Sequence, residues 1–386
     1  MTSIHNEDLI KNLIKKTTVP LILRKFVDDW PLCRWNLGKW SSVFGDKPVP
    51  FRCMKRNIVS TSPCWERMCS EKLLTFKEFI GKAEASEEWM YFDYKYLQQW
   101  FNADNELIKE VSWKKFGHPD KNASHSTLWV GSKGSHTPAH QDTYGYNIIT
   151  QLYGRKRWIL FPPETGNLKP TRVPYEESSV YSELNFYCPS NLDSFNGLTG
   201  ARLVELSAGD ALIVPSGWWH YVQNIDDVNI ALNIWLPHEK DTSNQVSEAL
   251  IKILVAQLCK DLPQETAKLL VNPNEVCVYI LILLTKLKKV RIKEVRKVRN
   301  SIFHYEYIKA RVYRVIPHSE QVRNLHCNLF QLSTLTFDCS SAFRTAQDDE
   351  LEGATDKLNL TKAVIDAFCQ SNVIDLVKQN LFARLS

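Results

Sequence analysis

The hydrophobic and polar positions of this chain define a β-rich centre between two regions of helical periodicity. Between residues 126 and 237, short runs of β-branched and aromatic residues alternate with Gly, Pro, Asp and Asn. The runs are STLWVGS, YNIITQLYG, RKRWILF, ALIVPS, HYVQNI and VNIALNIWL. Short strands at this spacing are typical of an antiparallel barrel or sandwich. The pattern therefore predicts a mainly β core with helices before and after it.

Helical periodicity marks both flanks of this core. Residues 6–16 predict a short helix with Asn6 as its N-cap and one apolar face. A strand-like run, LILRKFV, follows at 21–27. Beyond the β-rich centre, apolar residues recur at helix-face spacing, at Val246, Leu250, Leu254 and Leu258. Further helices are predicted at about 275–299 and 358–383.

These patterns divide the chain into four regions. Residues 1–87 are predicted to cap the β core, which covers 88–245, and a helical region (246–300) and a C-terminal helical extension (301–386) follow. The apolar stripe that begins at Val246 is too broad for a free surface helix. We therefore expect the helical region to form a homodimer or to dock a partner; the alternative is packing against the barrel of the same chain.

Composition limits the protein class. The 386 residues are 44% hydrophobic and 24% charged, which is globular composition. The longest apolar run, Val276 to Leu284, is far shorter than the ~20 residues that a membrane span needs. The opening MTSIHNEDLI lacks the features of a secretory signal, and none of the ten cysteines is spaced CxxC. We expect reduced thiols, no membrane association, and a cytoplasmic location with the nucleus as the alternative.

Charge is concentrated in one segment. The formal net charge is +5, but residues 286–299 contain eight Lys or Arg and one Glu, so the rest of the chain is slightly negative. This distribution does not favour nucleic acid as a partner. The basic segment is interpreted as the solvated face of an amphipathic helix, or alternatively as a docking site for an acidic partner.

One constellation of side chains predicts a metal site. His140 and Asp142 are separated by one residue, and on a strand such residues project to the same face. His220 supplies a third ligand from GDALIVPSGWWH. This segment predicts a turn, a buried strand, a second turn and a strand that re-enters the barrel. Two His and one carboxylate form the facial triad of non-haem Fe(II) oxygenases and leave coordination positions open. A lone HxD is a weak signal, and the surrounding strands and turns strengthen it.

Further polar residues predict a cosubstrate site. On a strand, Lys156 would share its face with Trp158, and an inward lysine among apolar neighbours needs an anion. The distal carboxylate of 2-oxoglutarate would be that anion; the alternative is a lysine that extends to the barrel rim. The hydroxyls of Thr137 and Tyr91 could bond the same carboxylate. Two further residues in apolar strands need polar partners, which a cosubstrate or water could supply: Asn147 and Asn233.

Three ordered motifs carry a family resemblance. SHTPAHQD, GRKRWILFPP and GDALIVPSGWWH followed by VNIALNIW resemble the JmjC group of cupin-fold Fe(II)/2-oxoglutarate oxygenases, over residues 18–245. The chain is similar to the small hydroxylase type, and WMYFDYKY and KPTRVPYEESSV resemble members associated with small heat-shock proteins. The resemblance implies a double-stranded β-helix (jelly roll) and a small heat-shock protein as partner. It also implies iron ligands at His140, Asp142 and His220, a 2-oxoglutarate contact at Lys156 with Thr137 and Tyr91, and nearby asparagines at Asn147 and Asn233.

The expected activity is hydroxylation of a side chain on a protein substrate. A non-catalytic scaffold for a small heat-shock protein is the main alternative. A metal-cupin isomerase or dioxygenase usually shows HxH followed by Glu, which is absent here. Histone demethylation is disfavoured because the sequence shows neither a zinc-binding cysteine cluster nor a reader-like module. His136, four residues before His140, is interpreted as an ordinary polar loop residue, with a ligand or substrate contact as the alternatives.

Overall fold

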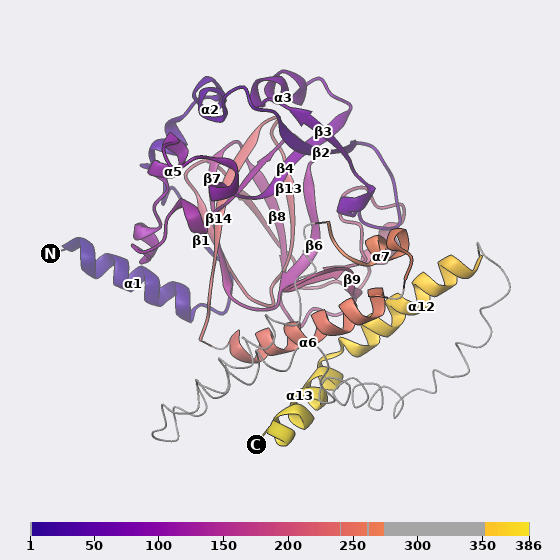
Figure 1. The fold of residues 1–386 in the computed structure, drawn as a ribbon. Helices are drawn as coiled ribbons and strands as arrows, with labels where there is room; N and C mark the ends of the chain where they lie inside the picture. Colours follow the sequence, from indigo (N-terminus) through magenta and orange to yellow (C-terminus); the bar gives the residue numbers. More distant parts are fainter. Residues whose placement is uncertain (1, 240, 261, 274–351, 386) are drawn as a thin grey trace, which may run out of the picture.

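Two antiparallel β-sheets form the centre of the molecule, with helices above and below them (Figure 1). The computed structural model describes residues 2–239, 241–260, 262–273 and 352–385. The predicted jelly-roll architecture with flanking helices is confirmed. The helix expected at 275–299, with its basic segment, lies outside the described residues.

Each sheet mixes strands from distant parts of the chain. The eight-stranded sheet has the order β1 (Leu21–Leu23), β12 (Ala211–Pro215), β7 (Tyr146–Tyr153), β14 (Asn229–Leu236), β5 (Thr127–Gly131), β4 (Glu88–Tyr96), β2 (Val49–Lys55) and β3 (Ser70–Leu74). The six-stranded sheet has the order β11 (Arg202–Leu206), β8 (Lys156–Phe161), β13 (Trp219–Asn224), β6 (His136–Asp142), β10 (Ser179–Ser182) and β9 (Pro170–Glu176). Strands of the predicted N-terminal cap thus extend the same sheet as the core.

Helices occupy both ends of the chain. The α-helices are α1 (Thr2–Lys16), α2 (Leu37–Phe44), α3 (Phe76–Ala83), α4 (Leu97–Trp100), α5 (Glu106–Glu110), α6 (Asp241–Lys260), α7 (Gln264–Leu270), α12 (Glu352–Phe368) and α13 (Ser371–Leu385). Short 3-10 helices are η1 (Pro31–Arg34), η2 (Glu66–Met68), η3 (Lys114–Phe116), η4 (Ala123–His125) and η5 (Leu192–Phe195). None of the helices described here has the length and apolarity needed to cross a bilayer.

Three sequence-based boundaries differ from the structure. The first helix begins at Thr2, so Asn6 lies inside it and is not its N-cap. The strand expected at 21–27 pairs with β12 only at Leu21–Leu23, because the chain then turns, with a positive φ at Lys25. The last helical pattern is split into α12 and α13. Local periodicity finds helices well and their ends poorly.

The middle strands of the eight-stranded sheet are buried on both faces, whereas its edge strand β3 is mostly exposed. Residues 146–152 of β7 are all buried, including the polar residues Asn147, Thr150 and Gln151. One face carries the main hydrophobic cluster together with the N-terminal helices, where Phe44 of α2 stacks on Phe76 of α3 at 4.3 Å. The other face packs against the six-stranded sheet, and Ile149 of β7 lies in one hydrophobic cluster with Trp158 and Leu160 of β8. This interior is where the predicted site residues lie.

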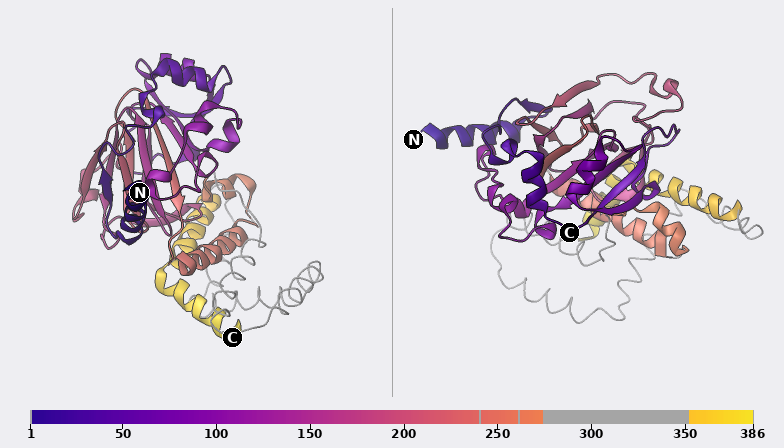
Figure 2. Two further views of the ribbon diagram at one scale, coloured as in Figure 1. Left: turned by 90° about the vertical axis from the view of Figure 1, so that its left-hand side faces the viewer. Right: turned by 90° about the horizontal axis from the view of Figure 1, so that it is seen from above.

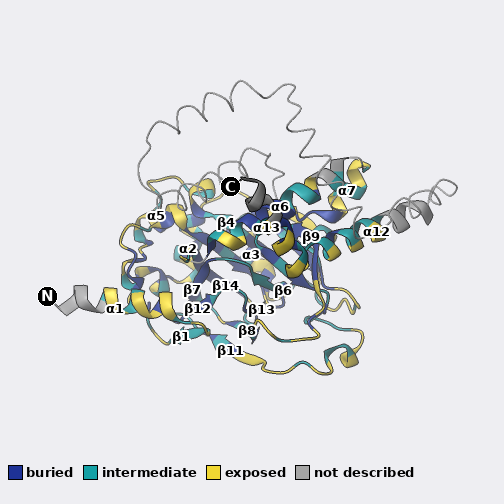
Figure 3. Ribbon diagram, turned by 90° about the horizontal axis from the view of Figure 1, so that it is seen from below, coloured by how far each residue is buried: buried dark blue, intermediate teal, exposed yellow. Residues whose placement is uncertain are grey.

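The C-terminal helices pack against one end of the sheets (Figures 1 and 2). The apolar stripe of α6 is largely covered within the chain, since Val246 and Leu250 contact Val377 of α13. A buried ion pair between Glu248 of α6 and Arg172 of β9 fixes the helix to the sheet. In Figure 3 the strands are mostly buried and the yellow, exposed residues follow the helix surfaces and loops. The apolar residues of α6 therefore do not need a second copy of the chain to cover them, and the homodimer stays a prediction.

Candidate metal centre and substrate cleft

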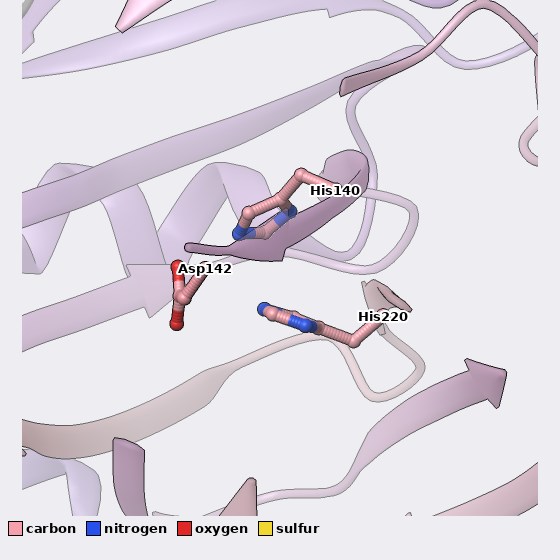
Figure 4. Close-up of side chains that lie close together, drawn as sticks. All are labelled: His140, Asp142 and His220. Atoms are coloured by element: carbon pink, nitrogen blue, oxygen red, sulfur yellow. The ribbon is translucent and has the colours of Figure 1, made fainter. Parts of the chain in front are cut away.

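Two neighbouring strands bring the predicted ligands together. His140 on β6 is the register partner of His220 on β13, and Asp142 follows on the same face of β6. One donor atom from each of the three residues lies within 4.8 Å of the other two. Figure 4 shows the three side chains pointing toward one another. Among the described residues, this is the only such group of three or more potential ligands.

The two imidazoles are held in one tautomer. Nδ1 of His140 lies 2.9 Å from the carbonyl of Pro138, and Nδ1 of His220 lies 2.9 Å from the carbonyl of Trp218. Because a carbonyl oxygen only accepts, each Nδ1 carries the proton and each Nε2 keeps its lone pair. Burial lowers the pKa of both side chains to about 4, so both are neutral at physiological pH. Neutral imidazole is the form that binds metal ions.

Asp142 supplies the third donor. Burial raises its pKa, and the indole N–H of Trp235 donates to its Oδ2 at 3.2 Å, which orients the carboxylate. Two neutral imidazoles and one carboxylate on one face are a donor set suited to Fe(II). The residues present therefore fit the metal that the sequence predicted.

A cavity beside the triad contains Lys156. The lysine is 3% exposed, and it shares the cavity walls with His140 and His220. Its Nζ donates to the hydroxyl of Tyr91 at 3.2 Å, and Thr137 also bonds that hydroxyl. Burial lowers the pKa of Lys156 to about 7, because removal from water disfavours the ammonium ion. The structure thus brings the lysine and both hydroxyls together, and the lysine does not extend to the rim.

A close backbone approach positions Tyr91. Gly131 of β5 lies opposite Tyr91 of β4 in the sheet. A Cβ at position 131 would lie 2.8 Å from Cδ2 of Tyr91 and 2.4 Å from Oγ of Ser135. Glycine is therefore required where β5 passes the tyrosine ring.

The two asparagines are mutual partners. Asn233 Nδ2 donates to Asn147 Oδ1 at 2.8 Å, and Asn233 Oδ1 accepts from the indole N–H of Trp129 at 2.8 Å. Both asparagines and Trp129 line the cavity that contains Lys156. Other residues of the protein therefore supply some of the hydrogen bonds that these buried amides need.

A larger cleft of about 330 Å³ opens next to the triad, with His140 and Asp142 in its wall. Four of its aromatic residues come from three strands: Tyr94 and Tyr96 from β4, Tyr181 from β10 and Trp235 from β14. Three further carboxylates line it: Glu66, Glu176 and Asp241. It is the described cavity best placed to admit a substrate to the metal site.

Sequence reasoning missed several residues of these cavities. Trp235 follows Asn233 by two positions on β14, so strand alternation alone placed it on the same face. Glu66 and Trp129 left no such signal, because their roles depend on contacts distant in sequence. His136 is neither a loop residue nor part of the ligand group: it is 2% exposed at the start of β6 and stacks on Tyr187 at 4.2 Å.

Comparison with known proteins places these features in a family. A family model for the cupin-like domain matches residues 8–242. HSPB1-associated protein 1 of Homo sapiens is 41% identical over 283 residues, which is 69% of this chain and 57% of the relative. Its homologue in Danio rerio is 36% identical over 282 residues (69% of this chain, 62% of the relative). Lysine-specific demethylase 8 of Xenopus tropicalis is 27% identical over 225 residues (56% and 47%). The chain thus spans less than two thirds of the length of these relatives.

Proposed function

Because the chain belongs to the cupin-like domain family, of JmjC type, we propose that it is an Fe(II)- and 2-oxoglutarate-dependent oxygenase that hydroxylates a side chain of a protein substrate. The observation that carries the proposal is one cavity with both His140 and His220 and the buried cation of Lys156 in its walls. A metal site for hydrolysis needs no buried cation beside it, whereas a bound dicarboxylate does.

Each residue has a part in this mechanism. His140 and His220 would hold Fe(II) through Nε2, and Asp142 through its carboxylate. The metal and 2-oxoglutarate together supply O2-dependent oxidation of a C–H bond. Lys156 would pair with the distal carboxylate of 2-oxoglutarate, and the hydroxyls of Tyr91 and Thr137 would complete its hydrogen bonds.

The surrounding residues restrict what else happens at the site. Trp235 fixes the orientation of the Asp142 carboxylate through its indole N–H. Trp158 lies beside His220, with ring centroids 5.8 Å apart, and covers the inner side of the site with apolar surface. Such a shell limits water around the metal and keeps the reaction on the bound substrate.

The names of the relatives add a partner to the proposal. We infer that a small heat-shock protein binds this chain, since relatives named for association with HSPB1 share about 40% of the aligned residues. The partner would be either the substrate or a protein that recruits the enzyme. A non-catalytic scaffold is the second candidate function, and the same relatives favour it.

The direct test is turnover. Purified protein with Fe(II), ascorbate and 2-oxoglutarate should release succinate, and a small heat-shock protein or another substrate should gain 16 Da. Asp142→Ala should abolish both, while Asp226→Ala, which alters only a surface pair with Arg155, should leave both unchanged. Stable binding of the heat-shock protein with neither succinate nor a mass shift would favour the scaffold.

A further inference from the structure

A separate cavity of about 420 Å³ lies at the end of β13 away from the triad. Asn224 of its lining is four residues from His220, which is about 13 Å along a strand. We propose that this cavity binds a phosphate monoester carried by a protein partner, such as a phosphorylated serine or threonine side chain. The inference does not depend on the proposed oxygenase, because the cavity shares no lining residue with the cleft or with the cavity of Lys156.

The cavity has a positively charged lining and is called the basic pocket below. Its charged residues are Arg56, Lys133 and Arg157, and no aspartate or glutamate is part of its described lining. Arg157 donates to Oε1 of Glu205 from Nε at 3.0 Å and from Nη2 at 2.7 Å, so its charge is compensated. A phosphate monoester carries about −1.5 to −2 charges at pH 7 and matches the two remaining cations. A carboxylate or a phosphodiester carries only one negative charge.

Neither of these two cations has a carboxylate partner. Nη2 of Arg56 donates to the carbonyl of Ala83 at 2.7 Å, and Nε donates to the carbonyl of Glu88 at 3.4 Å. These neutral oxygens orient the guanidinium, while the carboxylate of Glu88 pairs with Lys72. Lys133 is exposed and forms no ion pair with the acids that the structure describes. An anion in the basic pocket would therefore meet two cations without displacing a resident carboxylate.

Neutral donors complete the lining. The side chains of Asn57 and Gln223 and the hydroxyl of Tyr187 make no hydrogen bond within the described part of the chain. Gly134, at a φ of 87°, passes so close to the tyrosine that a Cβ would lie 2.6 Å from the Tyr187 hydroxyl oxygen. Burial raises the pKa of Tyr187 to about 12, so this hydroxyl remains a donor at neutral pH. Phosphate oxygens accept several charge-assisted hydrogen bonds at once, which such a lining can supply.

The position of the basic pocket favours a ligand attached to a protein. Lys133 and Asn57 are exposed, in the turn between β5 and β6 and the turn after β2, so a side chain that protrudes from a partner can reach them. Nucleic acid would need a continuous basic surface, whereas the chain outside residues 286–299 is slightly negative. A partner held at the basic pocket would leave the cleft beside the triad open.

Peptide binding tests this inference. The probes are fluorescent peptide libraries with randomised flanks and a central phosphoserine, serine or aspartate, offered to the full chain. We expect the phosphoserine library to bind about tenfold more tightly than the serine library, with a smaller difference at high salt. Lys133→Glu places a carboxylate in the basic pocket and should reduce this preference to about threefold or less, as should Arg56→Gln. Lys77→Glu, at an exposed position of α3, is the matched control and should leave the preference unchanged.

Circular dichroism checks that each variant is folded. Equal binding of the phosphoserine and serine libraries by the wild type would overturn the inference, and so would an unchanged preference in folded Lys133→Glu. Aspartate peptides that bind as tightly as phosphoserine peptides would reject phosphate as the ligand. Inorganic phosphate separates a free anion from a protein-bound one. It should displace the phosphoserine library only at concentrations far above those of the peptide, and displacement at equal concentrations would reject a protein partner.

Discussion

Each histidine of the triad is held by the carbonyl of the residue two positions before it. Because Pro138 and Trp218 fix the Nδ1 protons, each imidazole keeps its Nε2 lone pair for a metal ion. Burial has the opposite consequence for Lys156: it destabilises the charged ammonium form, which a bound anion would stabilise. At the scale of single residues, the two histidines are neutral and can bind a metal cation. The ammonium form of Lys156 is stabilised when an anion pairs with it.

Lys156 gives a prediction for cosubstrate binding. Lys156→Met should weaken 2-oxoglutarate binding by about 2 kcal/mol or more, because a buried carboxylate loses its charged partner. Calorimetry on the Mn(II)-loaded protein measures this, with the exposed Lys133→Met as the control. Equal affinities for wild type and Lys156→Met would place the cosubstrate elsewhere.

The same lysine predicts a pH dependence. Its pKa is about 7 without an anion, and a bound carboxylate favours the protonated form. Above pH 7, binding of 2-oxoglutarate must therefore take up a proton, so the affinity should fall as pH rises from about 7 to 9. The fall should be absent in Lys156→Met, and a wild-type affinity independent of pH in this range would mean that Lys156 takes up no proton when 2-oxoglutarate binds.

His136 predicts how stability depends on pH. Burial lowers its folded pKa from 6.5 to about 4, so in this window the unfolded chain binds more protons. Stability is then fully present above about pH 6.5 and falls as pH falls, by about 2 kcal/mol for this residue at pH 5. Urea unfolding at pH 7.5 and 5 should show a loss smaller by about that amount in His136→Phe. The same loss in both proteins would mean that His136 is protonated in the folded state.

At the scale of elements, side-chain contacts join the C-terminal helices to strands that lie far away in the sequence. The Arg172–Glu248 pair joins β9 to α6 with both side chains at most 4% exposed, and Asp366 of α12 accepts from the Arg172 backbone N–H at 2.7 Å. Asn272, just after α7, bonds Glu66 and Tyr181 in the wall of the cleft. The C-terminal helices therefore contribute to the side wall of the cleft beside the triad as well as covering apolar surface.

The buried pair gives a prediction for the helical region. Glu248→Gln leaves the Arg172 guanidinium buried without its counter-charge and should lower the free energy of unfolding by about 3–5 kcal/mol. Glu265→Gln removes an exposed pair with Lys268 and should cost at most about 1 kcal/mol. Chemical denaturation compares the two variants. A small effect of Glu248→Gln would show that α6 is held by its apolar contacts alone.

At the scale of the whole molecule, the β core and the triad could be predicted because their signals are local. The spacing of His140 and Asp142 on one strand and the turn before His220 are readable without knowledge of the partner strands. The extra residue that β4 has between Phe92 and Lys95 and the approach of Asn272 to Glu66 left no such pattern, because each depends on contacts between distant segments. The triad could therefore be predicted from the sequence, whereas the walls of the cleft are defined only by the folded chain.

If the triad is a metal centre, one Fe(II) ion binds at His140, Asp142 and His220. Anaerobic equilibrium dialysis followed by metal analysis measures this binding, with folding checked by circular dichroism. We expect one iron per chain for the wild type and for His136→Phe, and close to none for a folded His140→Ala. Stoichiometric iron in folded His140→Ala, or none in the wild type, would rule out the triad as the iron site.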